Sequence, residues 1–150
     1  MEDNYWNHNE LIDANQKELE ELLRYEISMF QETCKQLDLC QKTRFEKNLL
    51  LESLATHNRI LIEFFYNDKD EKYLNDLVAQ DFLPDTINWK NERPPITELL
   101  KEAKNKADKQ LAHLSRWRIK IEKDNKKGWD WQGIKRDIGK VIEKFEKYKK

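Results

Sequence analysis

His113 lies among basic residues at helical spacing, an arrangement that could support proton transfer or phosphate binding. Lys106, Lys109 and Arg116 stand seven, four and three positions away, so a helix would place them on the same face as the histidine. A histidine in such a positive field can move a proton near neutral pH. The structural alternative is that His113 flanks an apolar stripe and stacks on Trp117. The sequence leaves both interpretations open.

His57 is the second candidate for chemistry, because it falls in an apolar seam between Leu54 and Ile60. A histidine buried at such a position needs a hydrogen-bond partner. One interpretation is therefore a satisfied core histidine. The other is a polar site inside the bundle, with Arg59 or Glu63 beside His57.

The stretch 101–127 has a dense basic face and is a candidate surface for nucleic acid. Six of its cations are the expected contacts to phosphate: Lys104, Lys106, Lys109, Arg116, Arg118 and Lys120. Tryptophans at 117, 129 and 131 are interleaved with basic residues, and exposed rings of this kind stack on bases. Against this, Trp131 fits an apolar seam, and a buried ring stacks on no base.

Other kinds of site find little support in the sequence. The di-metal pattern of Glu-x-x-His pairs is absent, and the histidines come one per segment, so no metal site is predicted. Gly-rich phosphate loops and a nucleophile elbow are absent too, and no cofactor is expected. Cys34 and Cys40 stand six positions apart in one predicted helix, about 9 Å along its axis, so free thiols are expected.

Two long helices are expected to position His57. The first covers about 11–39 with Asn9 as its cap, and its apolar stripe is Ile12, Leu19, Leu23, Phe30, Cys34 and Leu37. The second begins where Thr43 and Glu46 form a capping box, and it ends at the polar cluster 67–70. Its apolar seam is Leu50, Leu54, Ile60, Leu61, Phe64 and Phe65.

Three more helices complete the expected bundle. A short one covers 71–82, and after it Trp89 is expected to cover one end of the bundle. The fourth starts after Pro95 and covers 96–125, with a buried stripe of Ile96, Leu100, Ala103, Ala107, Leu111, Leu114, Trp117 and Ile121. The last covers 131–148, with a seam of Trp131, Ile134, Ile138, Val141, Phe145 and Tyr148.

Length and composition agree with a helical bundle. The chain has 150 residues, 16 aromatic side chains, and only three glycines and three prolines, which favours a few long helices over a turn-rich β fold. Charge is segregated along the chain: it is −6 over 1–42, −4 over 43–100 and +9 over 101–150. Opposite charges of this kind attract helix faces within a bundle or across a dimer, or form a basic surface for nucleic acid.

Two segments resemble a group of uncharacterised bacterial helical proteins. They are LLLESLATHNRILIEFFYNDKD at 49–70 and NKADKQLAHLSRWR at 105–118, with VAQDF at 78–82 between them. In that group a His-x-Arg-x-Leu-Ile-x-Phe-Phe helix precedes a Lys-x-Leu-Ala-His-Leu helix. The resemblance covers about half of the chain and implies an all-helical fold, with no assigned activity.

The chain also remotely resembles the HEPN superfamily of helical bundles, many of which are toxin-type ribonucleases. Their mark is an arginine followed four to six residues later by a histidine on a late helix. The histidine here is His113, but Lys106 stands near the arginine's place, and lysine lacks the guanidinium fork that clamps phosphate. The resemblance would give His113 the acid–base role, with Lys106 and His57 or Arg59 assisting.

We therefore expect an all-α fold, an antiparallel helical bundle of four long helices plus one short helix in a single domain, 1–150. The expected function is non-catalytic and works through protein contacts, as a homodimer or with a helical protein partner. The alternatives are an RNA- or DNA-contacting module that uses 101–127, or a HEPN-like ribonuclease. An acidic N-terminus without an apolar run predicts no signal peptide, no membrane partner and a cytoplasmic location.

Overall fold

The computed structural model describes residues 10–39, 41–71, 73–110, 115–116, 118–120 and 128–149. All regular elements in these ranges are helices, which confirms the expected all-α bundle. The long ones are α1 (Gln16–Asp38), α2 (Arg44–Tyr66), α4 (Glu98–Gln110) and α6 (Trp131–Tyr148). The short ones are η1 (Lys69–Glu71), η2 (Ala79–Phe82) and α3 (Trp89–Glu92).

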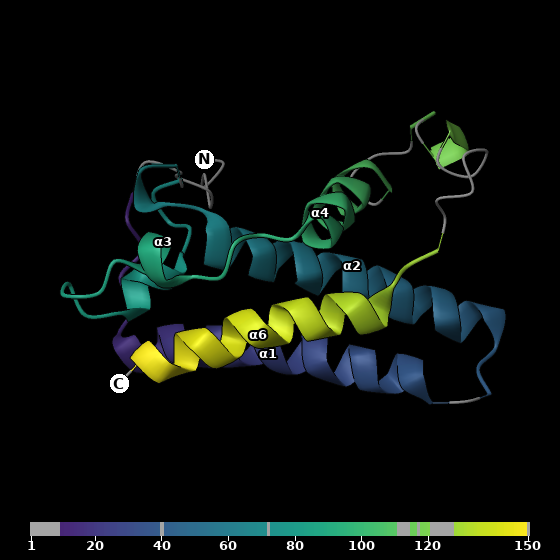
Figure 1. Cartoon of the computed structure of the whole chain (residues 1–150), viewed down its shortest axis with the longest axis horizontal. Helices are drawn as coiled ribbons and strands as arrows, with labels where there is room; N and C mark the ends of the chain where they lie inside the picture. The colour runs from purple at the N-terminus through teal and green to yellow at the C-terminus, as the bar shows by residue number, and fades with distance from the viewer. Residues whose placement is uncertain are drawn as a thin grey trace, which may run out of the picture.

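The helices pack around α2, which contacts α1, α4 and α6 (Figure 1). α1 and α2 form an antiparallel hairpin, and α6 runs back along α1. The direction of α6 is fixed by a contact between the end of α1 and the start of α6, where the Trp131 indole donates a hydrogen bond of 2.9 Å to Asp38 Oδ1. α4 crosses the other side of α2, and the fold is therefore a bundle with antiparallel sequence neighbours.

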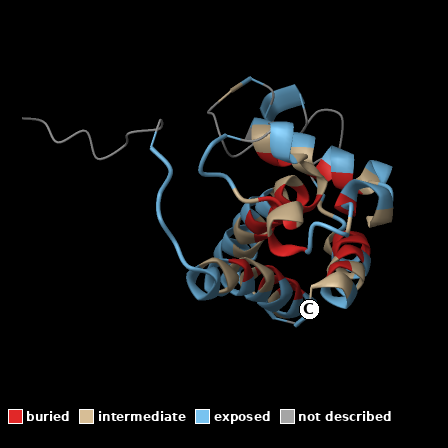
Figure 2. Cartoon of the chain, turned by 90° about the vertical axis from the view of Figure 1, so that its left-hand side faces the viewer, coloured by how far each residue is buried: buried red, intermediate tan, exposed pale blue. Residues whose placement is uncertain are grey.

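The core lies between these helices, where the buried faces point toward one another (Figure 2). Its largest side chains meet at the end of the bundle where α2 and α6 both end. Five aromatic rings there pack mostly edge to face, with centres 5.0–6.2 Å apart: Phe64, Phe65, Phe82, Trp89 and Phe145. Such pairs add stability beyond the area that they bury.

The start of α1 differs from the prediction. Asn9 lies outside the described residues, and the cap is Asn15, whose Oδ1 accepts a 3.0 Å hydrogen bond from the Glu18 amide while Glu18 Oε2 accepts one of 2.8 Å from the Asn15 amide. The preceding segment is not helical, because the Ile12 amide donates instead to Asn75 Oδ1 at 2.9 Å. Ile12 is consequently 72% exposed, so its place in the buried stripe was wrong.

α2 begins at the predicted capping box, which is confirmed by hydrogen bonds of 3.1 and 2.8 Å between Thr43 and Glu46. Of its predicted seam, Leu54, Leu61, Phe64 and Phe65 are buried, whereas Ile60 is 39% exposed and was placed wrongly. The buried contact at that turn is made by Leu61, which the seam also contained, so the packed face of α2 is narrower there than predicted.

Residues between Pro84 and Pro94 cover the end of α2, as predicted for Trp89. Its side chain is 2% exposed, and its indole donates a 2.8 Å hydrogen bond to the carbonyl of Phe65. Arg93 donates to the carbonyls of Phe65 and Tyr66 at 3.3 and 2.9 Å. The last carbonyls of α2 have no partner within the helix, so these two side chains satisfy them.

The predicted helix over 71–82 is wrong. Its described residues form the end of η1, a turn and η2 instead. Asp81 explains part of this, because its carboxylate accepts the Val78 amide at 2.9 Å and caps the short η2 turn. Leu74 is 50% exposed, whereas Val78 is buried, so the apolar period of this segment does not form one packed face.

The fourth helix is shorter than predicted. α4 starts at Glu98, where the Thr97 hydroxyl accepts the Leu100 amide at 3.3 Å, and it ends at Gln110. Ser115 and Arg116 are not helical, so a continuous helix over 96–125 is wrong. A separate helical turn covers 118–120, and the predicted stripe residues at 111, 114, 117 and 121 lie outside the described residues.

α6 follows its predicted seam, with Ile134, Ile138, Val141 and Phe145 buried. One polar residue shares that buried face. Asp137 is 6% exposed and accepts hydrogen bonds from the Thr97 hydroxyl at 2.7 Å and from Arg136 Nε at 2.9 Å, so α4 and α6 are joined by a satisfied buried carboxylate.

Candidate functional site

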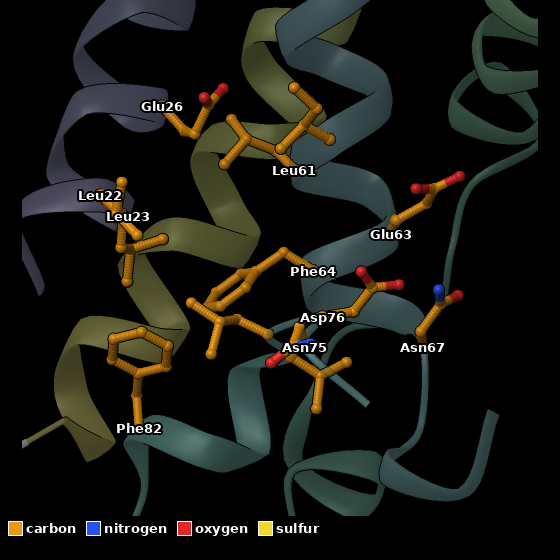
Figure 3. Close-up of a pocket in the computed structure, with 13 residues that line it drawn as sticks. Leu22, Leu23, Glu26, Leu61, Glu63, Phe64, Asn67, Asn75, Asp76 and Phe82 are labelled. Carbon is orange, nitrogen blue, oxygen red and sulfur yellow. The ribbon is translucent and has the colours of Figure 1, made fainter. Parts of the chain in front are cut away.

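A pocket opens between α1 and α2 at the end of the bundle where α2 ends (Figure 3). We call it the acidic groove, and its volume is about 390 Å³. Thirteen side chains from α1, α2, η2 and the segment before η2 line it: Leu22, Leu23, Glu26, Ile60, Leu61, Glu63, Phe64, Asn67, Asn75, Asp76, Leu77, Val78 and Phe82. This size is within the range of pockets that hold small ligands or partner side chains.

The floor of the acidic groove is apolar and belongs to the core. Leu23, Phe64 and Phe82 point toward one another there from α1, α2 and η2 (Figure 3). All three are less than 9% exposed. The floor is therefore rigid, because each of its side chains also packs on the helices behind it.

The rim of the groove exposes large apolar side chains. Leu22 is 59% exposed and Ile60 is 39% exposed, and they lie on α1 and α2. Tyr25, 55% exposed, follows on the next turn of α1. Apolar surface gathered around a pocket in this way is typical of interaction sites.

The polar lining of the groove carries one sign of charge. Its ionisable residues are Glu26, Glu63 and Asp76, and the lining includes no lysine, arginine or histidine. Glu26 and Glu63 stand on opposite sides of the apolar floor (Figure 3). The groove thus combines an apolar floor with carboxylates at its walls, and this suits an apolar group that bears a positive charge nearby.

His57 lies directly behind one of these carboxylates. Its Nδ1 is 2.6 Å from Glu26 Oε2, and the Tyr25 ring packs edge-on against the imidazole at 6.1 Å. His57 is 9% exposed, so it is a buried histidine with a partner, which the sequence offered as one of two interpretations. The partner is neither Arg59 nor Glu63. The contact fixes the Glu26 side chain at the groove wall.

Arg59 points away from His57, to the junction of α2 and α4. Its Nε lies 2.7 Å from Asp108 Oδ1 as an ion pair without an aligned hydrogen bond, and 3.4 Å from Glu63 Oε1. Lys104 Nζ completes the set, at 3.5 Å from Glu63 and 3.3 Å from Asp108. Glu63 therefore belongs both to the groove and to the charge network that joins α2 to α4.

Lys106 lies in a second pocket, about 470 Å³ in volume, between α4 and the start of α6. Its ammonium donates to the Gly128 carbonyl and lies 4.6 Å from the centre of the Trp129 ring. Burial lowers the pKa of Lys106, although Glu102 opposes this effect. These contacts hold α4 to the residues before α6. The ammonium of Lys106, which was predicted to contact phosphate, is therefore already paired within the protein.

The remaining predicted residues are distributed over different surfaces. Lys109 is exposed on α4, and Arg116, Arg118 and Lys120 are exposed beyond it. His113 lies outside the described residues, so its pairing with His57 stays a prediction. The structure does not bring Arg59 or Lys106 to His57, because one faces Asp108 and the other faces Gly128.

Metal and membrane sites find no support in the described ranges. No group of three or more histidine, cysteine, aspartate or glutamate side chains there could hold a metal ion. None of the helices in the same ranges is both long enough and apolar enough to cross a bilayer.

The sequence analysis missed the acidic groove itself. A signal was present in α1, where Leu22 and Tyr25 stand three positions apart and outside the buried stripe. Two large apolar residues on a polar helix face suggest a second contact surface. Glu26 and Glu63 gave no such signal, because their positions at the same groove depend on how α1 and α2 are rotated against each other.

Comparisons with protein-family models, with curated proteins and with solved structures give no match for this chain. The resemblances to the bacterial helical group and to the HEPN superfamily therefore stay predictions.

Proposed function

We propose that this bundle works through protein contacts and that the acidic groove binds a basic, apolar segment of a protein partner. The observation that supports this most directly is the rim of the groove, where Leu22 and Ile60 expose 59% and 39% of their surface beside an apolar floor. Apolar surface in this position is costly in water and stabilising in a complex.

The apolar part of the contact supplies the driving force. Full burial of a leucine or isoleucine side chain is worth about 1.5–3 kcal/mol. Covering the exposed parts of Leu22 and Ile60 would then contribute about 1 kcal/mol each. A partner side chain on the floor formed by Phe64 and Phe82 would add its own burial to this sum.

The charge of the groove determines which partner fits. Glu26 and Glu63 flank the floor, and Glu26 is held in place by His57. An arginine or lysine next to the inserted apolar group would meet these carboxylates, whereas an acidic segment would be repelled. A basic amphipathic helix has this composition, with apolar side chains at intervals of three and four and cations beside them.

Nucleic-acid binding is less well supported by the arrangement of the predicted cations. Lys104 faces Glu63 and Asp108, and Lys106 faces Gly128 and Trp129. A phosphate contact by either lysine would have to replace these interactions. The exposed Arg116 is thus a more accessible cation than either of them.

A peptide-binding experiment tests the proposal. The probe is a fluorescent helical peptide with leucines on one face and arginines beside them, and its fluorescence anisotropy is followed as protein is added. The wild-type protein should bind it, and Ile60→Ser should weaken binding about fivefold, equivalent to about 1 kcal/mol. Phe45→Ser is the matched control, because Phe45 is 70% exposed on α2 but does not line the groove.

A second peptide with glutamate in place of every arginine tests the charge requirement. It should bind much more weakly than the basic peptide, and the difference should shrink as salt is added. Equal loss of binding in Ile60→Ser and Phe45→Ser, or equal binding of both peptides, would contradict the proposal. Binding of single-stranded RNA with a steep salt dependence, unaffected by Ile60→Ser, would favour the nucleic-acid alternative.

A further inference from the structure

We infer that the acidic groove is occupied by a basic turn from a second copy of this chain, so that the protein forms a reciprocal homodimer. The basic turn consists of Arg116, Arg118 and Ile119. This inference rests on the proposed function, because it names the partner of the same groove. It follows from the chemistry of the turn, its place in the fold and the distribution of charge along the chain.

The basic turn has the composition that the groove requires. Ile119 is 55% exposed, and Arg116 and Arg118 are exposed beside it. The turn is ordered by hydrogen bonds from the Arg118 amide to the Ser115 carbonyl, 3.2 Å, and from the Ile119 amide to the Arg116 carbonyl, 3.1 Å. A hydrogen-bonded turn whose described residues include an exposed apolar side chain and exposed cations needs little further ordering to bind.

A turn and a groove in the same molecule lie too far apart to meet. The groove is formed where α1 begins and α2 ends, whereas the 118–120 turn lies beyond the opposite end of α4 (Figure 1). Both surfaces therefore face outward in one copy. A second copy can bring its turn to the groove without any change in the helices.

A dimer with two-fold symmetry contains the contact between turn and groove twice. If the turn of the first copy binds the groove of the second, the same rotation places the turn of the second copy in the groove of the first. The reciprocal arrangement uses both surfaces and closes the assembly at two chains. The turn belongs to the segment 101–150, whose charge is +9, and the groove to the segment 1–100, whose charge is −10, the sum of −6 and −4.

The groove has room and partners for the turn. Its volume of about 390 Å³ is sufficient for one branched apolar side chain and the stems of neighbouring residues. Glu63 Oε1 lies 3.4 Å from Arg59 Nε and 3.5 Å from Lys104 Nζ. An incoming guanidinium can bind the Glu63 carboxylate with two parallel hydrogen bonds, a geometry that neither of these contacts has, so arginine is well suited to join or replace them.

The first measurement is the mass of the wild-type protein by sedimentation equilibrium over a range of concentrations. We expect a dimer whose dissociation constant rises with salt. Ile60→Ser in the groove and Ile119→Ser in the turn should each raise that constant at least tenfold. Phe45→Ser, at a more exposed apolar position outside both surfaces, should leave it unchanged. Circular dichroism checks that all variants keep the wild-type helix content.

The decisive measurement mixes the two weakened variants. A homodimer of either variant has no intact contact, because every groove or every turn is altered. A mixed dimer has one intact contact, formed by the turn of the Ile60→Ser chain and the groove of the Ile119→Ser chain. Mixing should therefore produce dimers at concentrations where each variant alone is monomeric, and a mixture that stays monomeric would overturn the inference.

Other outcomes separate this inference from the proposed function. A wild-type protein that is monomeric at millimolar concentration but binds the basic peptide would overturn the dimer and leave the proposed function standing. A monomer that binds no peptide would overturn both. A dimer that is lost in Phe45→Ser and kept in Ile60→Ser would place the interface at the α1–α2 connection and overturn the inference.

Discussion

Trp89→Phe should destabilise the protein through the end of α2 that carries the groove. The indole is 2% exposed, and it donates a 2.8 Å hydrogen bond to the Phe65 carbonyl while its ring packs 5.6 Å from that of Phe145. The replacement removes two buried carbons, about 1.5 kcal/mol, and one hydrogen bond, about 1 kcal/mol. Arg93 still donates to Phe65, so the carbonyl keeps a partner. The expected loss in the free energy of unfolding is about 2–3 kcal/mol.

Urea denaturation followed by far-ultraviolet circular dichroism measures this loss without relying on tryptophan fluorescence. A domain of this size has about 5–15 kcal/mol of stability, so the variant should remain folded. Trp131→Phe is the matched control, because its indole donates to Asp38 at an exposed position and its ring lies 5.8 Å from Lys47 Nζ. That change should cost about 1 kcal/mol or less. Equal losses in the two variants would show that the end of α2 is not held by Trp89.

Three further predictions concern buried polar groups. Asn58 is fully buried and both atoms of its amide lack a hydrogen-bond partner, so Asn58→Leu, which has the same branching, should raise the urea midpoint by removing a penalty of about 1–3 kcal/mol. Burial opposes ionisation of Asp137, but hydrogen bonds from Thr97 and Arg136 hold its pKa below the usual range. The stability that it contributes is therefore present above about pH 4 and lost as the pH falls through its lowered pKa. Asp137→Asn should cost about 1–2 kcal/mol at pH 7 in the same assay, and this cost should shrink as the pH falls below about 4. Burial raises the pKa of the Cys34 thiol to about 11, an effect that Lys135 opposes and Asp38 reinforces. Iodoacetamide at pH 8 should accordingly modify the Cys34 peptide far more slowly in the folded than in the urea-unfolded protein, as followed by mass spectrometry.

Local signals predicted the parts of the fold that depend on neighbours within one or two turns. Thr43 and Glu46 stand three positions apart and satisfy each other's backbone amides, so the start of α2 could be placed from the sequence. The seam of α6 was equally predictable, because Ile138 and Phe145 repeat at the spacing of a helix that packs along its whole length.

Distant partners decided the parts that the sequence did not predict. Ile12 fits the stripe of α1 by its position, but its amide pairs with Asn75, which is 63 residues away in the chain. Leu74 and Val78 have helical spacing, yet the Asp81 carboxylate accepts the Val78 amide and favours a short turn. A periodic pattern indicates what a segment can form, and tertiary hydrogen bonds determine whether it forms.

The site was harder to predict than the fold for the same reason. His57 was recognised as a residue that needs a partner, but the choice of Glu26 over Arg59 or Glu63 depends on how α1 packs against α2. Arg59 and Glu63 stand two and six positions from His57 on the same helix, and neither spacing brings two side chains together. The actual partner comes from the facing helix and lies at 2.6 Å.

Glu63 lines the groove and also pairs with Lys104 on α4. Binding of a partner in the groove is therefore expected to change the ion pairs between α2 and α4. The Glu63 carboxylate is 3.4 Å from Arg59 and 3.5 Å from Lys104, and both cations also lie beside Asp108, at 2.7 and 3.3 Å. A partner cation that draws Glu63 toward the groove would leave Arg59 and Lys104 with Asp108, so the α2–α4 junction would lose the contacts of Glu63 and keep those of Asp108. Because coupling between sites is reciprocal, a Lys104–Glu63 pair that opposes cation binding in the groove weakens that binding by the same free energy by which the bound cation weakens the pair. Lys104 on α4 thus contacts a residue of one groove, and the basic turn proposed to enter the other groove follows α4 in the chain.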